Sequence, residues 1–124
     1  MINVQKNERI IDIESMNEFL ELGVDHPSAP IVLDFYADWC NPCKKLSPYF
    51  FACAQQLLSV KKDCFFAKVN VDNNPELTDE FRIQSIPCLV LVKGGKVLYR
   101  VEGNQVNQQN VDKLFRLAEQ ESIS

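Results

Sequence analysis

Two cysteines separated by two residues are the part of the chain best suited to chemistry. Cys40 and Cys43 follow the apolar run 31–36, which indicates a buried strand, and the amphipathic stretch from Asn41 onward indicates a helix. Cys40 would then lie in the first helical turn with Cys43 one turn further along the same face, close enough for an S–S bond. Unpaired N–H groups and the dipole at a helix start favour a thiolate, which lowers the cysteine pKa. The pair therefore predicts a redox site.

A structural disulfide and a zinc site are the two alternative interpretations of this pair. Closing a four-residue loop stabilises a fold by only about 2 kcal/mol, against roughly 4 kcal/mol for several tens of residues, so a stabilising disulfide would join distant segments. Zinc usually takes two close ligand pairs, and the remaining candidates form no second C-x-x-C: Cys53, Cys64, Cys88 and the single His26. His26 precedes a proline, which favours a surface residue over a ligand. We expect no metal.

The composition indicates one globular domain without a nucleic-acid or membrane signature. The 124 residues, 46% of them apolar, suffice for one domain spanning 1–124. The 13 basic and 17 acidic residues are spread along the chain at net charge −4, which argues against nucleic-acid binding. No apolar stretch reaches membrane-spanning length, and residues 1–9 lack the apolar segment of a leader. Five scattered cysteines suit a reducing compartment, so we expect a cytoplasmic protein.

The elements that must position the cysteine pair alternate between strands and helices. Apolar runs predict strands at 10–13, 31–36, 64–71, 88–93 and 96–101, and Gly94-Gly95 predicts a hairpin between the last two. Caps and apolar stripes predict helices from Ser15 to about Leu22, Asn41 to about Val60, Pro75 to about Phe81, and Gln108 or Asn110 to Glu121. This order indicates an α/β fold with a central mixed β-sheet and helices on both faces.

Three local signals make finer predictions about the helices. Ser15 and Glu18 form a capping box, and Gly23 opens the loop that follows the first helix. Pro48 lies inside the second predicted helix and should kink it, because proline removes a hydrogen bond and clashes with the preceding turn. Asn74 is a good N-cap before the proline that follows it.

Four motifs, in order along the chain, resemble those of the thioredoxin family. The segment D-F-Y-A-D-W-C-x-P-C-K at 34–44 is similar to the thioredoxin active-site signature. A-K-V-N-V-D at 67–72, S-I-P at 85–87 and K-G-G-K at 93–96 follow in the expected order. The resemblance covers roughly residues 10–120 and implies the thioredoxin fold in a single thioredoxin domain.

The chemical roles of four residues follow from their positions and from this resemblance. Cys40, expected to be the exposed sulfur, should attack substrate disulfides, and Cys43, deeper in the helix, should resolve the mixed disulfide. Asp34 stands in an apolar strand, so we expect it to be buried rather than at an edge, with a raised pKa suited to proton transfer. In thioredoxins the matching aspartate assists the buried cysteine. The resemblance implies that Lys68 approaches and tunes Asp34, with a surface lysine as the alternative.

The resemblance also implies a surface that binds substrate. Ile86-Pro87 is similar to the family's cis-proline turn facing the cysteines, where the backbone would pair with an extended substrate segment. An apolar platform around the attacking sulfur would comprise Trp39, Asn41, Pro42, Ile86 and Gly103. For Trp39, packing in the core is the alternative.

Three positions depart from the family pattern. Asn41 stands where thioredoxins usually carry Gly, and the residues between the cysteines tune the redox potential. Cys88 stands where Thr is common, and we interpret it as a small buried hydrophobe, with a third active thiol as the alternative. Asn104 replaces a frequent Ala. Cys53 and Cys64 are expected to be packing residues.

The sequence predicts a thiol–disulfide oxidoreductase that reduces protein disulfides through a cycling Cys40/Cys43 pair. The resemblance implies no bound cofactor, electrons from NADPH through a thioredoxin reductase, protein disulfides as substrates, and a monomer. A disulfide oxidase or isomerase is one alternative, but oxidising relatives commonly place His between the cysteines, where this chain has Asn41 and Pro42. A non-catalytic thioredoxin-like adaptor is the other, but such modules typically lose one cysteine and this chain keeps both.

Overall fold

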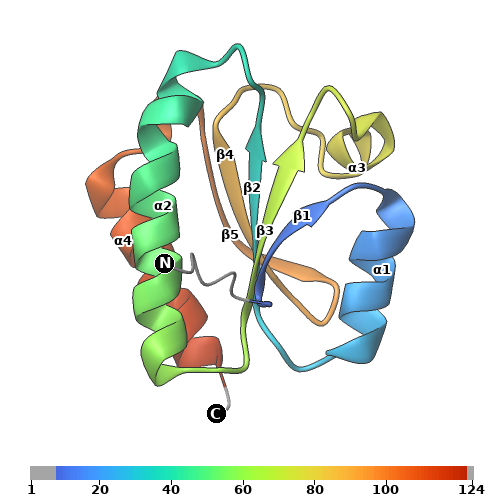
Figure 1. The fold of residues 1–124 in the computed structure, drawn as a ribbon, viewed down its shortest axis with the longest axis vertical. Coiled ribbons are helices and arrows are strands. Elements are labelled where there is room, and N and C mark those ends of the chain that lie inside the picture. The colour runs from blue at the N-terminus through green and yellow to red at the C-terminus, as the bar shows by residue number, and fades with distance from the viewer. Residues whose placement is uncertain (1–7, 123–124) are drawn as a thin grey trace, which may run out of the picture.

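The computed structural model describes residues 8–122 as a five-stranded sheet with helices packed against it (Figure 1). Residues 1–7 and 123–124 lie outside the described part. The prediction about residues 1–9, which lack the apolar segment of a leader, therefore falls mostly outside it. The elements in chain order are β1 (Ile10–Ile13), α1 (Met16–Asp25), β2 (Ile31–Tyr36), α2 (Asn41–Val60), β3 (Phe65–Asn70), α3 (Pro75–Glu80), β4 (Cys88–Lys93), β5 (Lys96–Glu102), the 3-10 turn Gly103–Gln105, and α4 (Gln108–Glu121). This is the predicted alternation.

The sheet is mixed, with strand order β1-β3-β2-β4-β5. β3 pairs in parallel with both β1 and β2, whereas β4 is antiparallel to β2 and to β5. Figure 1 shows α2 and α4 on one side of the sheet and α1 and α3 on the other. The predicted fold class, an α/β fold with a central mixed sheet covered on both faces, is confirmed.

β2 lies at the centre of the sheet and is buried on both faces, which explains its nearly unbroken apolar sequence. Val32 packs with the core under α2 and α4, whereas Leu33 and Phe35 belong to the core under α1 and α3. Because side chains alternate along a strand, Asp34 faces the same side as Val32. The strand therefore carries one carboxylate into the core on the α2 side.

The first helix is longer than predicted, because α1 continues through Gly23 to Asp25. A glycine inside a helix costs about 1 kcal/mol relative to alanine. Contacts of Phe19 and Leu22 with the core beneath α1 offset that cost. Ser15 Oγ accepts the N–H of Glu18 as predicted, but the Glu18 carboxylate bonds the N–H of Glu14 instead of that of Ser15.

Asn74 precedes α3 as predicted, but its side chain does not cap the helix. Its Nδ2 donates to the carbonyls of Ile13 and Asn70, at 3.1 and 3.0 Å. Asn74 is buried, so its amide satisfies strand-end carbonyls that water cannot reach. The residue ties together the ends of β1 and β3.

The Gly94-Gly95 pair and Pro48 are the two remaining local signals, and they lie in a hairpin turn and inside a helix. Gly94 and Gly95 both have positive φ, 58° and 78°, which suits the tight turn of the β4–β5 hairpin. α2 spans Pro48 as one helix from Asn41 to Val60. β2 ends at Tyr36 and α2 begins at Asn41, and the cysteine pair lies at this junction.

Candidate active site

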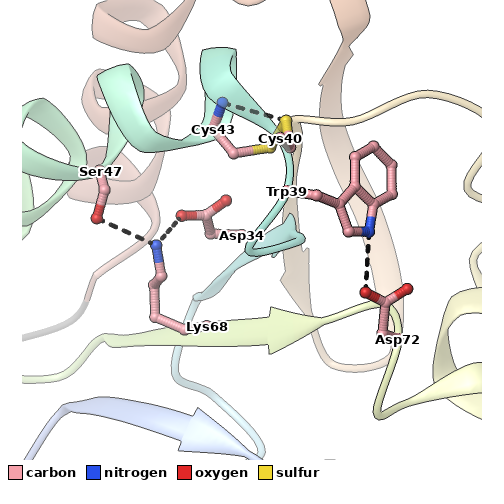
Figure 2. Close-up of a disulfide and its surroundings, with 7 residues drawn as sticks. All are labelled: Asp34, Trp39, Cys40, Cys43, Ser47, Lys68 and Asp72. Atoms are coloured by element: carbon pink, nitrogen blue, oxygen red, sulfur yellow. Dashed lines mark hydrogen bonds and ion pairs between the residues drawn. A yellow bond between two sulfur atoms is a disulfide. The ribbon is translucent and has the colours of Figure 1, made fainter.

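The cysteine pair lies where β2 has ended and α2 begins, and the two sulfurs form a disulfide (Figure 2). Their Cα atoms are 5.3 Å apart. The helix starts at Asn41 as predicted, and Cys40 is its N-cap residue rather than a member of the first turn. Its Sγ accepts the N–H of Cys43 at 3.2 Å. A sulfur that receives an N–H at a helix start is favoured as a thiolate.

The predicted difference in exposure between the two sulfurs is wrong. Cys40 is 5% exposed and Cys43 is 4% exposed. Both pack with Ala37, and the partly buried Ile86 lies against them, which explains why the first cysteine is also covered. The two sulfurs therefore differ in hydrogen bonding and in position on the helix, not in burial.

Asp34 is buried beneath the helical turn that carries the disulfide, as Figure 2 shows, with 2% of its surface exposed. The removal of the carboxyl from water raises its pKa, and the nearby Lys68 ammonium opposes that rise. Lys68 Nζ lies 2.7 Å from Asp34 Oδ2. Oδ1 has no hydrogen-bond partner among the described residues. Asp34 is thus a buried acid with one paired and one unpaired oxygen.

Lys68 has further contacts that the sequence analysis missed. Its ammonium also donates to Ser47 Oγ on α2 at 3.5 Å (Figure 2). The ring centroids of Tyr36 and Phe50 lie 4.6 and 5.5 Å from Nζ. These contacts hold the lysine inward over the sheet, rather than along its surface. Only the one-turn spacing of Ser47 from Cys43 could have suggested the hydroxyl.

Trp39 does not pack in the core, because 67% of its surface is exposed. Its indole Nε1 donates to Asp72 Oδ2 at 3.0 Å (Figure 2). Asp72 follows β3, and the sequence analysis gave it no role. Since parallel strands β2 and β3 end at the same edge of the sheet, the residues after them could have been expected to meet. The bond orients the indole beside the disulfide.

A groove of about 590 Å³ runs from the start of α2 to the start of α4 and includes four of the predicted substrate-binding residues. Those four residues are Pro42, Ile86, Pro87 and Gly103. Trp39 and Asn41 do not line the groove, although both are exposed and precede Pro42, which does line it. The remaining lining residues are Lys45, Leu46, Tyr49, Asn104, Val106, Asn107, Gln108 and Val111. The groove is a largely apolar surface next to the disulfide.

The loop before β4 forms the wall of this groove. The Ile86–Pro87 peptide bond is cis. Pro87 C=O accepts the N–H of Gly103 at 2.9 Å. Gly103 has φ of 59°, and a Cβ there would lie 2.9 Å from Ser85 Oγ. The positive φ favours glycine at this position, and any larger residue would also require the Ser85 side chain to shift.

The three remaining cysteines are free thiols, and neither they nor His26 takes part in the disulfide. Burial raises the pKa of the Cys88 thiol to about 12, which fits a packing residue. Burial also raises the pKa of Cys53 and Cys64. His26 is half-buried against the Phe65 ring, 4.4 Å between centroids, rather than simply exposed. Between residues 8 and 122 no three His, Cys, Asp or Glu side chains are grouped to hold a metal. No helix of that part is long and apolar enough to cross a membrane.

Comparison with known proteins gives a consistent set of relatives. The family model for thioredoxin matches residues 11–116. A thioredoxin of Chlamydia caviae is 33% identical over 114 residues, which cover 92% of this chain and 98% of that protein. A bifunctional thioredoxin reductase/thioredoxin of Mycobacterium leprae is 38% identical over 74 residues, 60% of this chain and 16% of that protein.

Solved structures agree with the sequence relatives. The X-ray structure of Fasciola hepatica thioredoxin superimposes with a TM-score of 0.77 at 27% sequence identity, covering 86% of this chain and 97% of that chain. The match includes nearly the whole relative, so the likeness concerns the complete fold. Together with the disulfide at the start of α2, these findings show that the chain belongs to the thioredoxin family.

Proposed function

We propose that Cys40 is the attacking and Cys43 the resolving sulfur of this protein-disulfide reductase. The Cys40 thiolate attacks one sulfur of a substrate disulfide, which forms a mixed disulfide and releases the other substrate sulfur as a thiolate. Cys43, as a thiolate, then attacks Cys40 Sγ and releases the second substrate sulfur. The substrate gains two electrons, and the protein is left with the Cys40–Cys43 disulfide. The hydrogen bond from Cys43 N–H to Cys40 Sγ is the observation that carries this assignment.

Asp34 acts as the base that deprotonates Cys43 during resolution. Burial raises the pKa of Asp34, which makes its carboxylate a stronger proton acceptor than an ordinary one, and the proton taken from Cys43 can pass to the released substrate thiolate. The unpaired Oδ1 supports this role, because that oxygen is available to accept a proton. Lys68 limits how far burial raises the pKa, through its ion pair with Oδ2.

An extended segment of the substrate protein occupies the groove of about 590 Å³ beside the disulfide. The apolar walls would cover the residues next to the substrate cysteine, and the backbone of Ile86 and Pro87 would pair with the segment. Exposed Trp39 and Asn41 complete the surface at the other side of Cys40. Gly103 keeps this approach open, since any side chain there would meet Ser85.

Each turnover leaves a disulfide, so the cycle needs an external dithiol to restore the two thiols. We assign this step to a thioredoxin reductase that draws on NADPH, with no cofactor bound by the chain itself. A relative whose name joins the two activities in one protein supports that pairing. We further propose that residues 1–124 act as a single domain, as a monomer, in electron transport within the cytoplasm.

Reduction of insulin disulfides, with dithiothreitol as the external dithiol, tests the function without a reductase. The parent is expected to accelerate the reaction, and Cys40→Ser is expected to return the rate to that of dithiothreitol alone. Absence of acceleration by the parent would identify a non-catalytic adaptor. A reduction potential much closer to that of oxidising enzymes than to about −270 mV would favour a disulfide oxidase or isomerase.

A further inference from the structure

Three charged side chains lie in one row across the sheet. Asp12 of β1 pairs in register with Lys68 of β3, and Lys68 pairs in register with Asp34 of β2. Side chains at the same register of neighbouring strands point to the same face of the sheet. The ammonium of Lys68 therefore lies between the carboxylates of Asp12 and Asp34 along the row. The row runs from the edge strand β1 to the centre of the sheet.

The two ends of this row differ in their access to water. Asp34 is 2% exposed, Lys68 is 19% exposed, and Asp12 is exposed. A cleft of about 250 Å³ lies between β1 and α2 and is lined by both Asp12 and Lys68, but not by Asp34. Solvent therefore reaches the Lys68 ammonium from the side of Asp12.

The Lys68 ammonium, in the middle of the row, is held on the side of Asp34. It forms its ion pair with Asp34 and, among the described residues, none with Asp12. Ser47, which also lines the cleft, accepts a hydrogen bond from the same ammonium at 3.5 Å. Figure 2 shows Lys68 Nζ between Ser47 and Asp34.

We propose that Ser47 and Asp12 are opposing positioning residues for Lys68: Ser47 holds the ammonium against the Asp34 carboxylate, and Asp12 draws it outward across the cleft. Neither residue touches the reacting sulfurs, so both act through Lys68. The inference rests on the proposed role of Asp34 for its relevance to catalysis. Its physical content, the control of the ionisation of Asp34, is measurable without turnover.

The two residues are expected to affect Asp34 in opposite directions. Loss of the Ser47 hydroxyl frees the ammonium to move outward, which destabilises the Asp34 carboxylate and raises its pKa. Loss of the Asp12 charge leaves the ammonium with Asp34 as its only carboxylate in the row, which lowers that pKa. Outside the row, Tyr36 and Cys88 interact electrostatically with Asp34, and the Cys40–Cys43 disulfide lies over it (Figure 2). Asp38 acts on Tyr36.

The test is the titration of the Asp34 carboxyl, followed by ¹³C NMR in the full chain with its disulfide intact. Ser47→Ala should move the titration midpoint up by about 0.5 pH unit, and Asp12→Asn should move it down by a similar amount. Ser47→Thr and Asp12→Glu keep the hydroxyl and the charge and should restore most of each shift. Asp25→Asn, which removes an exposed carboxylate at the end of α1 on the other side of the sheet, is the charge-matched control and should leave the midpoint in place.

Repetition in a Lys68→Met background separates action through Lys68 from direct effects. There, both substitutions should lose their influence on the Asp34 midpoint. Midpoints that move in the same direction, that do not move in the parent background, or that move equally without Lys68 would overturn the proposal. If Lys68→Met does not fold, Lys68→Gln supplies a neutral background that can still hydrogen-bond to Asp34.

The pH dependence of mixed-disulfide resolution is the second readout. If Asp34 is the proton relay, the pH profile should move with the NMR midpoint in each variant. Opposite midpoint shifts without any change in the rate profile would leave the positioning of Lys68 established and reject the relay role. The failure of one idea is therefore distinguishable from the failure of the other.

Discussion

The start of α2 and the start of β4 each carry a covered sulfur beside the Ile86–Pro87 loop, but they offer different environments. Cys40 is 5% exposed, and its Sγ receives an N–H at a helix start. Cys88 is completely buried in a strand, and burial raises its pKa to about 12. Burial is thus shared by both sulfurs, and the helix-start hydrogen bond is not. Donors at the sulfur, more than its exposure, decide which cysteine is suited to act as a nucleophile.

The largest expected effect separates the two sulfurs by substitution. Cys40→Ser should lower insulin reduction by about 10³-fold or more, because the attacking sulfur is lost. Cys43→Ser should instead accumulate covalent adducts with substrate proteins, visible on non-reducing gels, because nothing releases them. Adducts should persist when Cys88→Ala is added to Cys43→Ser. Their disappearance would make Cys88 a working thiol and erase the contrast between the two regions.

Alkylation of the reduced protein with iodoacetamide at pH 7 compares the same sulfurs directly. Cys40 should titrate below the ordinary thiol value of about 8.5 and react about 10³-fold or more faster than Cys88, whose thiolate is scarce. Peptide mass spectrometry over time gives both rates. Cys43, inside the helix, should react slowly. Equal rates for Cys40 and Cys88 would show that the helix start confers no advantage.

Asp34 offers a test of the proton transfer that only the α2 site should need. Asp34→Asn should slow the release of mixed disulfides at pH 7 by about 10²-fold, since the base for Cys43 is lost while the neutral amide avoids a buried charge. Stopped-flow measurement of the resolution step checks this. Unchanged resolution would leave Asp34 with a structural role alone. Iodoacetamide labelling of Cys88 serves as the control and should be unaffected.

The same substitution predicts a pH dependence of stability. Burial raises the pKa of Asp34 in the folded protein above its ordinary value of 3.8, so the folded state binds this proton more tightly than the unfolded chain does. The contribution of Asp34 to the free energy of unfolding is then full below the unfolded pKa and is lost as the pH rises through the folded pKa. Asp34→Asn should therefore gain stability relative to the parent as pH rises. Urea unfolding between pH 4 and 9 measures the difference, and an opposite trend would contradict the assignment.

The smallest expected effect concerns the packing role of the β4 sulfur. Cys88→Ala should lower the free energy of unfolding by about 1 kcal/mol, because a small buried side chain is shortened. Insulin reduction should stay close to that of the parent. Urea unfolding measures the change in stability, and the insulin-reduction assay measures the activity. A large loss of activity at unchanged stability would assign chemistry to the start of β4.

Several features of the fold and site follow from local sequence. The apolar runs predicted the five strands of residues 8–122 to within one residue at each end. In β2 and β4 the runs are nearly unbroken because these strands are buried on both faces, and the glycine pair has the positive φ that the hairpin turn requires. The spacing of Cys40 and Cys43 predicted the disulfide, since three residues on a helix start bring the sulfurs together. The burial of Asp34 followed from its apolar neighbours in β2.

Other features depended on which segments meet in space. The cover over Cys40 comes from Ile86, far along the chain, so exposure could not be deduced from its place before the helix. Lys68 bonds to Ser47 and Trp39 bonds to Asp72, and each partner comes from another part of the fold. Asn74 was predicted as a cap because caps are local, but burial beside the ends of β1 and β3 gave its amide other acceptors. Sequence alone determined the elements and the reactive pair, because backbone conformation, caps and side-chain periodicity are local. Tertiary structure decided exposure and hydrogen-bond partners, because these depend on atoms brought together from distant positions.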